Sequence, residues 1–166
     1  MKPPRLNLWT PARPGALVVA CSDGRLQQSV DAFLASDLGI TDYDRLYLPG
    51  GPGALAANGD YLRADVARRE LEFLITAHRL DRIVLLFHGA APDGPEHAVC
   101  ADYRRRLYGR PREELAARQE HDAATLIRQI GWGGRLTVRA FRADVGSDCR
   151  VRFHELHPAE ERSSVQ

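Results

Sequence analysis

Short apolar runs alternate with longer amphipathic stretches over most of this 166-residue chain. The strand-like runs are rich in β-branched residues, and the longer stretches repeat their apolar side chains at helical spacing. Strands that alternate with helices form a parallel sheet. Strands are predicted at 15–20, 43–48, 82–87, 136–143 and 149–156, and helices at 26–38, 61–80, 96–107 and 111–130. The last two strands predict an antiparallel hairpin, so we expect an α/β fold with a mainly parallel sheet of four to five strands flanked by helices.

The length and charge of the chain restrict its organisation and its partners. A chain of 166 residues with 44% hydrophobic content is predicted to form a single domain over residues 1–166, with an extended arm at 1–14 and a frayed polar tail at 158–166. Positive and negative side chains cancel to a net charge of +1, which favours neither nucleic acid nor an anionic membrane as a partner. With no apolar segment long enough for a membrane span or a secretory signal, we expect a cytoplasmic protein.

Polar and sulfur-bearing residues follow the predicted parallel strands. Cys21, the loop at 49–53 and His88 each come directly after a strand, and the carboxyl ends of parallel strands share one edge of the sheet, where ligands bind. Cys100 joins them if the helix that begins near residue 96 returns to the same edge. A Cys-His-Cys set leaves a fourth tetrahedral position open, as catalytic zinc sites do, so the sequence predicts a zinc centre.

Asp23 and Arg25 lie in the turn after Cys21, close enough to form a charge-assisted pair at the site. Each candidate also has an ordinary structural interpretation. Asp23 could cap the following helix, Cys21 could be a small buried apolar residue, and His88 could be a core histidine. Cys149 falls in the terminal hairpin, and we predict a structural role for it away from the strand ends.

The segment Cys21-Ser22-Asp23-Gly24-Arg25 resembles the Cys-x-Asp-x-Arg signature of β-class carbonic anhydrases. The order of elements from about residue 15 to 156 is also similar to that family. The resemblance implies that Cys21, His88 and Cys100 bind zinc. It further implies that Asp23, oriented by Arg25, orients a zinc-bound hydroxide that hydrates carbon dioxide reversibly to bicarbonate. A homodimer or higher homo-oligomer is implied as well.

The sequence departs from the family pattern in two places. Most members have His-x-x-Cys at the third strand, whereas His88 is followed by Gly89-Ala90-Ala91. Either His88 pairs with Cys100 across an inserted loop, a spacing similar to that of the carboxysomal subclass, or His97 supplies the histidine with the usual spacing to Cys100. We favour His88. The second departure is the loop at 48–53, which lacks the family's Asn-Ala-Gly pattern and reads Leu-Pro-Gly-Gly-Pro-Gly.

These departures leave alternatives to carbon dioxide hydration. The chain could be a non-catalytic or regulatory protein of carbonic-anhydrase-like fold. It could also be a zinc hydrolase that acts on another small electrophile, such as carbon disulfide or carbonyl sulfide, because the chemistry needs only a compact electrophilic carbon. A third hypothesis takes Cys21 as a thiol nucleophile, as in flavodoxin-like cysteine hydrolases.

Overall fold

The structure is a computed structural model that describes residues 9–56, 60–131 and 133–157. The described residues form five strands and four α-helices, joined in places by short 3₁₀ turns. The strands are β1 (Ala16–Cys21), β2 (Asp44–Leu48), β3 (Arg82–Ala90), β4 (Thr137–Val145) and β5 (Val151–Leu156). The helices are α1 (Gln27–Asp37), α2 (Tyr61–His78), α3 (Ala101–Arg106) and α4 (Arg112–Ile130), with 3₁₀ turns η1 (Gly51–Ala54) and η2 (Glu96–Ala98).

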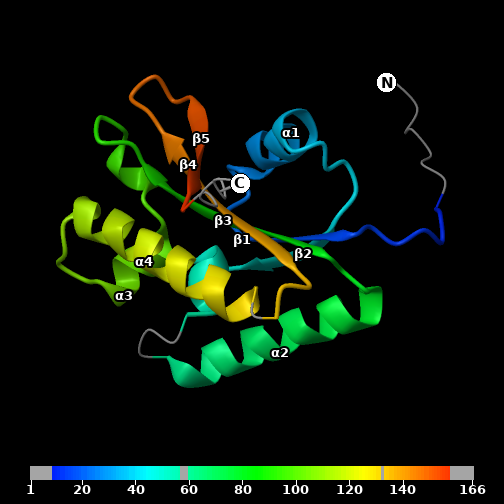
Figure 1. Cartoon of the computed structure of the whole chain (residues 1–166). Helices are drawn as coiled ribbons and strands as arrows, with labels where there is room; N and C mark the ends of the chain where they lie inside the picture. The colour runs from blue at the N-terminus through cyan, green and yellow to red at the C-terminus, as the bar shows by residue number, and fades with distance from the viewer. Residues whose placement is uncertain (1–8, 57–59, 132, 158–166) are drawn as a thin grey trace, which may run out of the picture.

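All five strands belong to one sheet in the order β2-β1-β3-β4-β5 (Figure 1). Strands β2, β1, β3 and β4 run parallel to their neighbours, and β5 returns antiparallel to β4. The prediction of a mainly parallel sheet that ends in an antiparallel hairpin is therefore confirmed. Because the four parallel strands point the same way, Cys21, His88 and the end of β4 lie at one edge.

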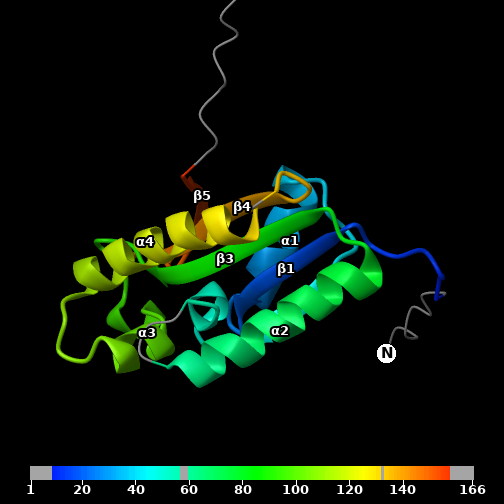
Figure 2. The same cartoon turned by 60° about the horizontal axis from the view of Figure 1, so that its bottom comes forward.

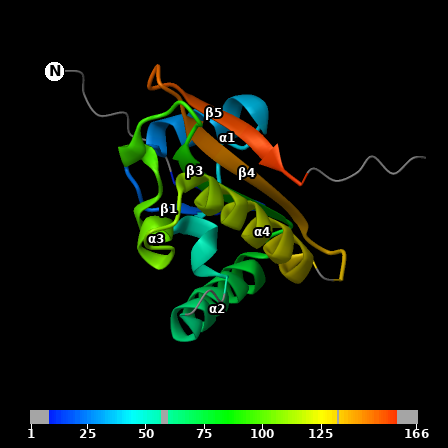
Figure 3. The same ribbon diagram turned by 90° about the vertical axis from the view of Figure 1, so that its left-hand side faces the viewer.

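Helices cover both faces of the sheet, which explains why its central strands are almost continuously apolar. Helix α1 packs on one face, and α2 and α4 pack on the other (Figures 2 and 3). Alternate residues of β1 divide between two cores, with Val18 facing the α1 side and Val19 the α2–α4 side. Leu34 of α1 and Leu126 of α4 are fully buried in these two cores.

Three boundaries differ from the sequence prediction. Strand β3 continues to Ala90, which pairs with Val145, so His88 lies within the strand instead of after it. The segment at 49–53, expected to be a loop, enters a 3₁₀ turn at Gly51. The predicted helix at 96–107 is broken in two, because Val99 and Cys100 have the extended ψ angles of 135° and 118°, which no helix accommodates.

The apolar stripe expected on the long helix is only partly buried. Leu71 is in the core, whereas Leu62 is 77% exposed and Val66 is 52% exposed. Helical spacing identifies a face of the helix but not what covers it.

Parts of the predicted chain organisation lie outside the described residues, namely residues 1–8 of the arm and the tail at 158–166. Residues 9–14 carry neither helix nor strand, and the extended arm stays a prediction. A single domain over residues 1–166 stays a prediction. Among the helices of the described ranges, none combines the length and the apolar character that crossing a membrane demands.

Candidate metal centre

Cys21 is placed at the sheet edge by β1, of which it is the last residue. It pairs in register with Leu48, and the chain beyond both residues turns away from the sheet. The η1 turn then packs directly against this strand end. Gly51 has φ +56°, and a Cβ atom there would lie 2.8 Å from the backbone nitrogen of Cys21. The Gly-rich segment therefore lets one backbone approach another closely, which only glycine allows here.

His88 lies near the carboxyl end of β3, the central strand of the sheet, and it is only 4% exposed. The side-chain amide of Gln119, from α4, donates to the backbone carbonyl of His88 at 2.9 Å. Arg142 of β4 donates through Nε to the amide oxygen of Gln119, also at 2.9 Å. Neither ring nitrogen of His88 has a hydrogen-bond partner in the described part of the chain. A buried imidazole without a partner is costly, and it points to a ligand-binding role.

Cys100 reaches the same place from the segment between β3 and α3. It is the residue just before α3 and is 2% exposed. The segment that leads to it is fixed by side chains from elsewhere in the fold. Arg112 donates to the carbonyl of Gly94 at 2.9 Å, and Ser147 donates to the carboxylate of Asp93 at 2.6 Å. The segment between β3 and α3 thus has a defined path that returns Cys100 to the sheet edge.

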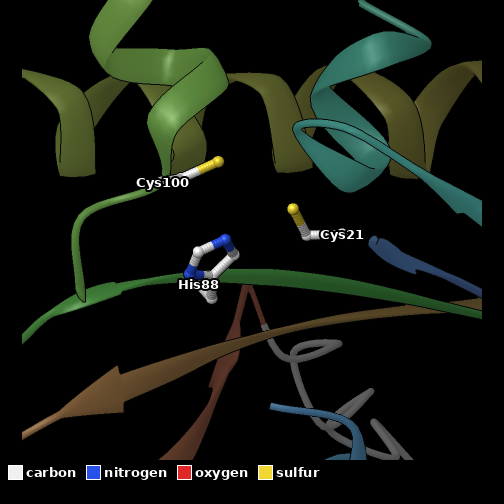
Figure 4. A group of neighbouring side chains, drawn as sticks. All are labelled: Cys21, His88 and Cys100. Atoms are coloured by element: carbon white, nitrogen blue, oxygen red, sulfur yellow. The ribbon is translucent and has the colours of Figure 1, made fainter. Parts of the chain in front are cut away.

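Cys21, His88 and Cys100 converge on one point, with ligand atoms that all lie within 4.8 Å of one another (Figure 4). The neighbouring Cys100 thiol lowers the pKa of Cys21 to about 4, and His88 lowers it further against the effect of burial. The neighbouring Cys21, together with burial, raises the pKa of Cys100. The pair therefore favours one thiolate, the form that binds metals.

The geometry of this cluster fits zinc. In a tetrahedral site with Zn–S bonds of about 2.3 Å, two sulfur ligands lie ~3.8 Å apart. Ligand atoms within 4.8 Å of one another need to move by about 1 Å or less to reach such an arrangement. Two sulfurs and one imidazole are also donors that zinc prefers. His97 is not part of this cluster, because it is exposed on η2.

Asp23 and Arg25 form the ion pair that their spacing predicts. The Nε of Arg25 lies 2.9 Å from Oδ1 of Asp23, and a second bond joins Nη2 to Oδ2. These hydrogen bonds lower the pKa of Asp23 to about 2, so the carboxylate is ionised at neutral pH. Asp23 does not cap α1, whose N-cap is Leu26 without a side-chain hydrogen bond. The carboxylate instead accepts from the backbone N–H of Arg25.

A cavity of about 180 Å³ lies beside this ion pair and reaches His88. Asp23, Arg25 and His88 line it together with apolar side chains from η2 and the β4–β5 hairpin. Cys149 also lines this cavity, so the prediction that it lies away from the strand ends was wrong. The reason is that β4 runs parallel to β3 and carries its hairpin to the same edge.

Two positioning residues escaped the sequence analysis. Gln119 sits in a helix among charged residues, and nothing local distinguishes it from a solvent-facing glutamine. Gly51 was noticed only as part of a turn-forming segment, although a run of glycines directly after a strand is a signal of close backbone approach. Both act through contacts between distant parts of the chain.

The fold and the cluster together define an α/β protein with a candidate zinc centre at the carboxyl edge of its sheet. No protein-family model and no curated protein matches the sequence. Solved structures similar to the chain include carbonic anhydrases, several of them of the β class. The carbonic anhydrase from Glaciozyma antarctica is 16% identical with a TM-score of 0.47, covering 86% of this chain and 84% of that one.

Two further similar structures belong to fungal β-carbonic anhydrases. The wild-type enzyme CafD of Aspergillus fumigatus is 13% identical with a TM-score of 0.47, covering 89% of this chain and 91% of that chain. One structure of the tetrameric β-carbonic anhydrases from Sordaria macrospora is 16% identical with a TM-score of 0.45, covering 88% of this chain and 82% of that chain.

Proposed function

We propose that the chain is a zinc-dependent lyase of the β-carbonic anhydrase type that hydrates carbon dioxide reversibly to bicarbonate. The observation that carries this proposal is the convergence of Cys21, His88 and Cys100 within 4.8 Å, beside an ionised Asp23. Cys21, His88 and Cys100 would hold the metal. Bound zinc lowers the pKa of a coordinated water to about 7, which supplies a nucleophile at neutral pH.

The role of Asp23 follows from its charge state and its place in the cavity wall. As a carboxylate it accepts hydrogen bonds and donates none, so it can orient a water whose proton points toward it. Arg25 fixes the carboxylate in position and keeps it ionised. Leu26, Val145 and Val151 line the same cavity with apolar surface, which suits an uncharged substrate such as carbon dioxide. Gln119 keeps the backbone of His88 in place.

Zinc content tests the ligand set directly. We expect about one zinc per chain in the wild type, and loss of zinc in Cys21→Ser, His88→Ala and Cys100→Ser. His97→Ala and Cys149→Ser are the matched controls, because each removes a similar side chain outside the cluster, and both should retain zinc. A purified chain that takes up no zinc would refute the proposal. Loss of zinc in His97→Ala but not in His88→Ala would refute the choice of histidine.

Catalysis is tested separately on zinc-loaded protein by stopped-flow hydration of carbon dioxide. Asp23→Asn should keep its zinc and lose activity by about 10- to 100-fold, the usual effect of removing a residue that orients a metal site. If the zinc-loaded chain is inactive toward carbon dioxide but active toward carbon disulfide or carbonyl sulfide, the proposed substrate is wrong and the compound that is turned over takes its place. Inactivity toward all three compounds would favour a non-catalytic role. If metal-free protein is active and alkylation of Cys21 abolishes that activity, Cys21 is favoured as a thiol nucleophile.

We further propose a homo-oligomer in the cytoplasm. Large apolar side chains of α2 are exposed, with Leu62 at 77% and Phe73 at 64%. Exposed apolar area of this kind is typical of a surface that contacts another chain. Sedimentation of the purified protein across a range of concentrations tests this, and a monomer at all concentrations would contradict it.

A further inference from the structure

The cavity beside the metal centre has a cysteine, Cys149, in its wall. Cys149 is the exposed member of the three cysteines, whereas Cys21 is half-buried and Cys100 is buried. It lies in the turn between β4 and β5 with φ +58°, and its backbone N–H donates to the carbonyl of Gly146 at 3.0 Å. The turn therefore fixes a residue that is both exposed to solvent and part of the cavity wall.

The cavity connects this thiol with the buried centre. His88 is 4% exposed and its ring nitrogens have no hydrogen-bond partner in the described residues, yet the residue lines the same cavity as Cys149. The volume of about 180 Å³ equals about six times the ~30 Å³ that one water occupies in the liquid. A substituent of several heavy atoms on Cys149 would therefore fill or cap the space through which a small molecule reaches His88 and Asp23.

We infer that Cys149 is a modification site for low-molecular-weight disulfides, and that the attached group closes the cavity. The sulfur of Cys149, as a thiolate, attacks one sulfur of the disulfide. A new S–S bond forms, the original S–S bond breaks, and the other half leaves as a thiolate that takes up a proton. The reaction is reversed by an added thiol. This inference rests on the proposed function in one respect: it takes this cavity to be the path by which the substrate reaches the metal centre.

The reaction should be selective for Cys149 because access decides which thiol exchanges. Cys100 is 2% exposed, and Cys21 is packed against the η1 turn. Arg150 provides a matched control position, because it is the next residue in the same turn, is exposed, and does not line the cavity. A thiol at position 150 in a Cys149→Ser background would be modified without filling the cavity.

The experiment treats the full chain with oxidised glutathione and compares the wild type, Cys149→Ser, and Cys149→Ser with Arg150→Cys. Peptide masses locate the adduct, and the ring signals of His88 in ¹H–¹⁵N spectra report whether the cavity is filled, with or without zinc. We expect an adduct and shifted His88 signals in the wild type, and neither in Cys149→Ser. The Arg150→Cys chain should carry the adduct with unshifted signals.

Zinc-loaded wild type should also lose hydration activity by about tenfold or more on modification, and regain it with a reducing agent. The inference is overturned if Cys149 of the folded wild type forms no adduct. It is also overturned if the His88 signals do not shift, or if they shift equally in the Arg150→Cys chain. If the chain takes up no zinc, the proposed function fails while the adduct and the His88 signals still decide this inference.

Discussion

Replacing Gly51 with alanine should destabilise the protein, because both its backbone conformation and its surroundings exclude a Cβ atom. Gly51 has φ +56°, and for an L-residue this left-handed conformation costs about 1–2 kcal/mol. The added Cβ would also lie 2.8 Å from the nitrogen of Cys21 and 3.1 Å from the carbonyl oxygen of Leu86. These are backbone atoms of two central strands, which cannot rotate away, so overpacking adds ~1–3 kcal/mol. The total loss is about 2–5 kcal/mol.

Gly39 separates the two contributions. Its φ is +64°, but a Cβ there would meet nothing within 4 Å in the described structure. Gly39→Ala should therefore lose only the conformational part, ~1–2 kcal/mol. Urea unfolding of the two variants and the wild type, followed by circular dichroism, measures the loss in the free energy of unfolding for each variant. A chelator is present throughout, and the comparison requires an unchanged m-value. Equal destabilisation by Gly39→Ala and Gly51→Ala would refute the close approach of η1 to β1.

Three other predictions concern single interactions and the metal. Tyr103→Phe removes the buried hydrogen bond to Asp122 and should lower the free energy of unfolding by about 1–3 kcal/mol, whereas Tyr108→Phe, at an exposed position, should change nothing measurable. Arg139 lowers the pKa of Glu155, so the stability from this pair is present above the usual carboxyl pKa and is lost as the pH falls through the lowered value. Glu155→Gln should therefore cost at most about 1 kcal/mol in urea unfolding at neutral pH, and less at about pH 3; an equal cost at both would contradict this. Zinc at a hundredfold excess over its dissociation constant should stabilise the wild type by ~2.7 kcal/mol, seen as a lower Tm on adding chelator, and Cys100→Ser should show no such shift.

The sequence predicted best what depends on neighbouring residues. Asp23 and Arg25 pair because they share one turn, and the strand before them is apolar on both faces, so their position at the sheet edge follows from local pattern. The position of Cys100 depends instead on contacts made by Arg112 and Ser147, which are distant in sequence. Periodicity cannot report such contacts, and this is why the helix around Cys100 was predicted unbroken.

The error on Cys149 has a different cause. Both strands of the hairpin were predicted, but Cys149 was expected away from the ends of the parallel strands. Strand β4 is parallel to β3, with His88 opposite Ala143 and Ala90 opposite Val145. Its end must therefore lie at the same edge as the end of β3, and the turn that follows must border the site. The surroundings of Cys149 therefore depend on the direction of β4, which the sequence pattern does not predict.

Arg25 joins the two parts of the candidate site that come from separate segments. Its Nε and Nη2 bind Asp23, while its Nη1 donates to the carbonyl of His97 at 3.2 Å. The residues between the end of β3 and Cys100, numbers 91–99, form a long connection, yet lengthening a loop adds only slowly to the entropy lost on closing it. A few anchors are therefore enough to fix Cys100, and one of them is the residue that holds Asp23 ionised. The orientation of the Asp23 carboxylate and the position of the Cys100 thiol thus depend on the same guanidinium group.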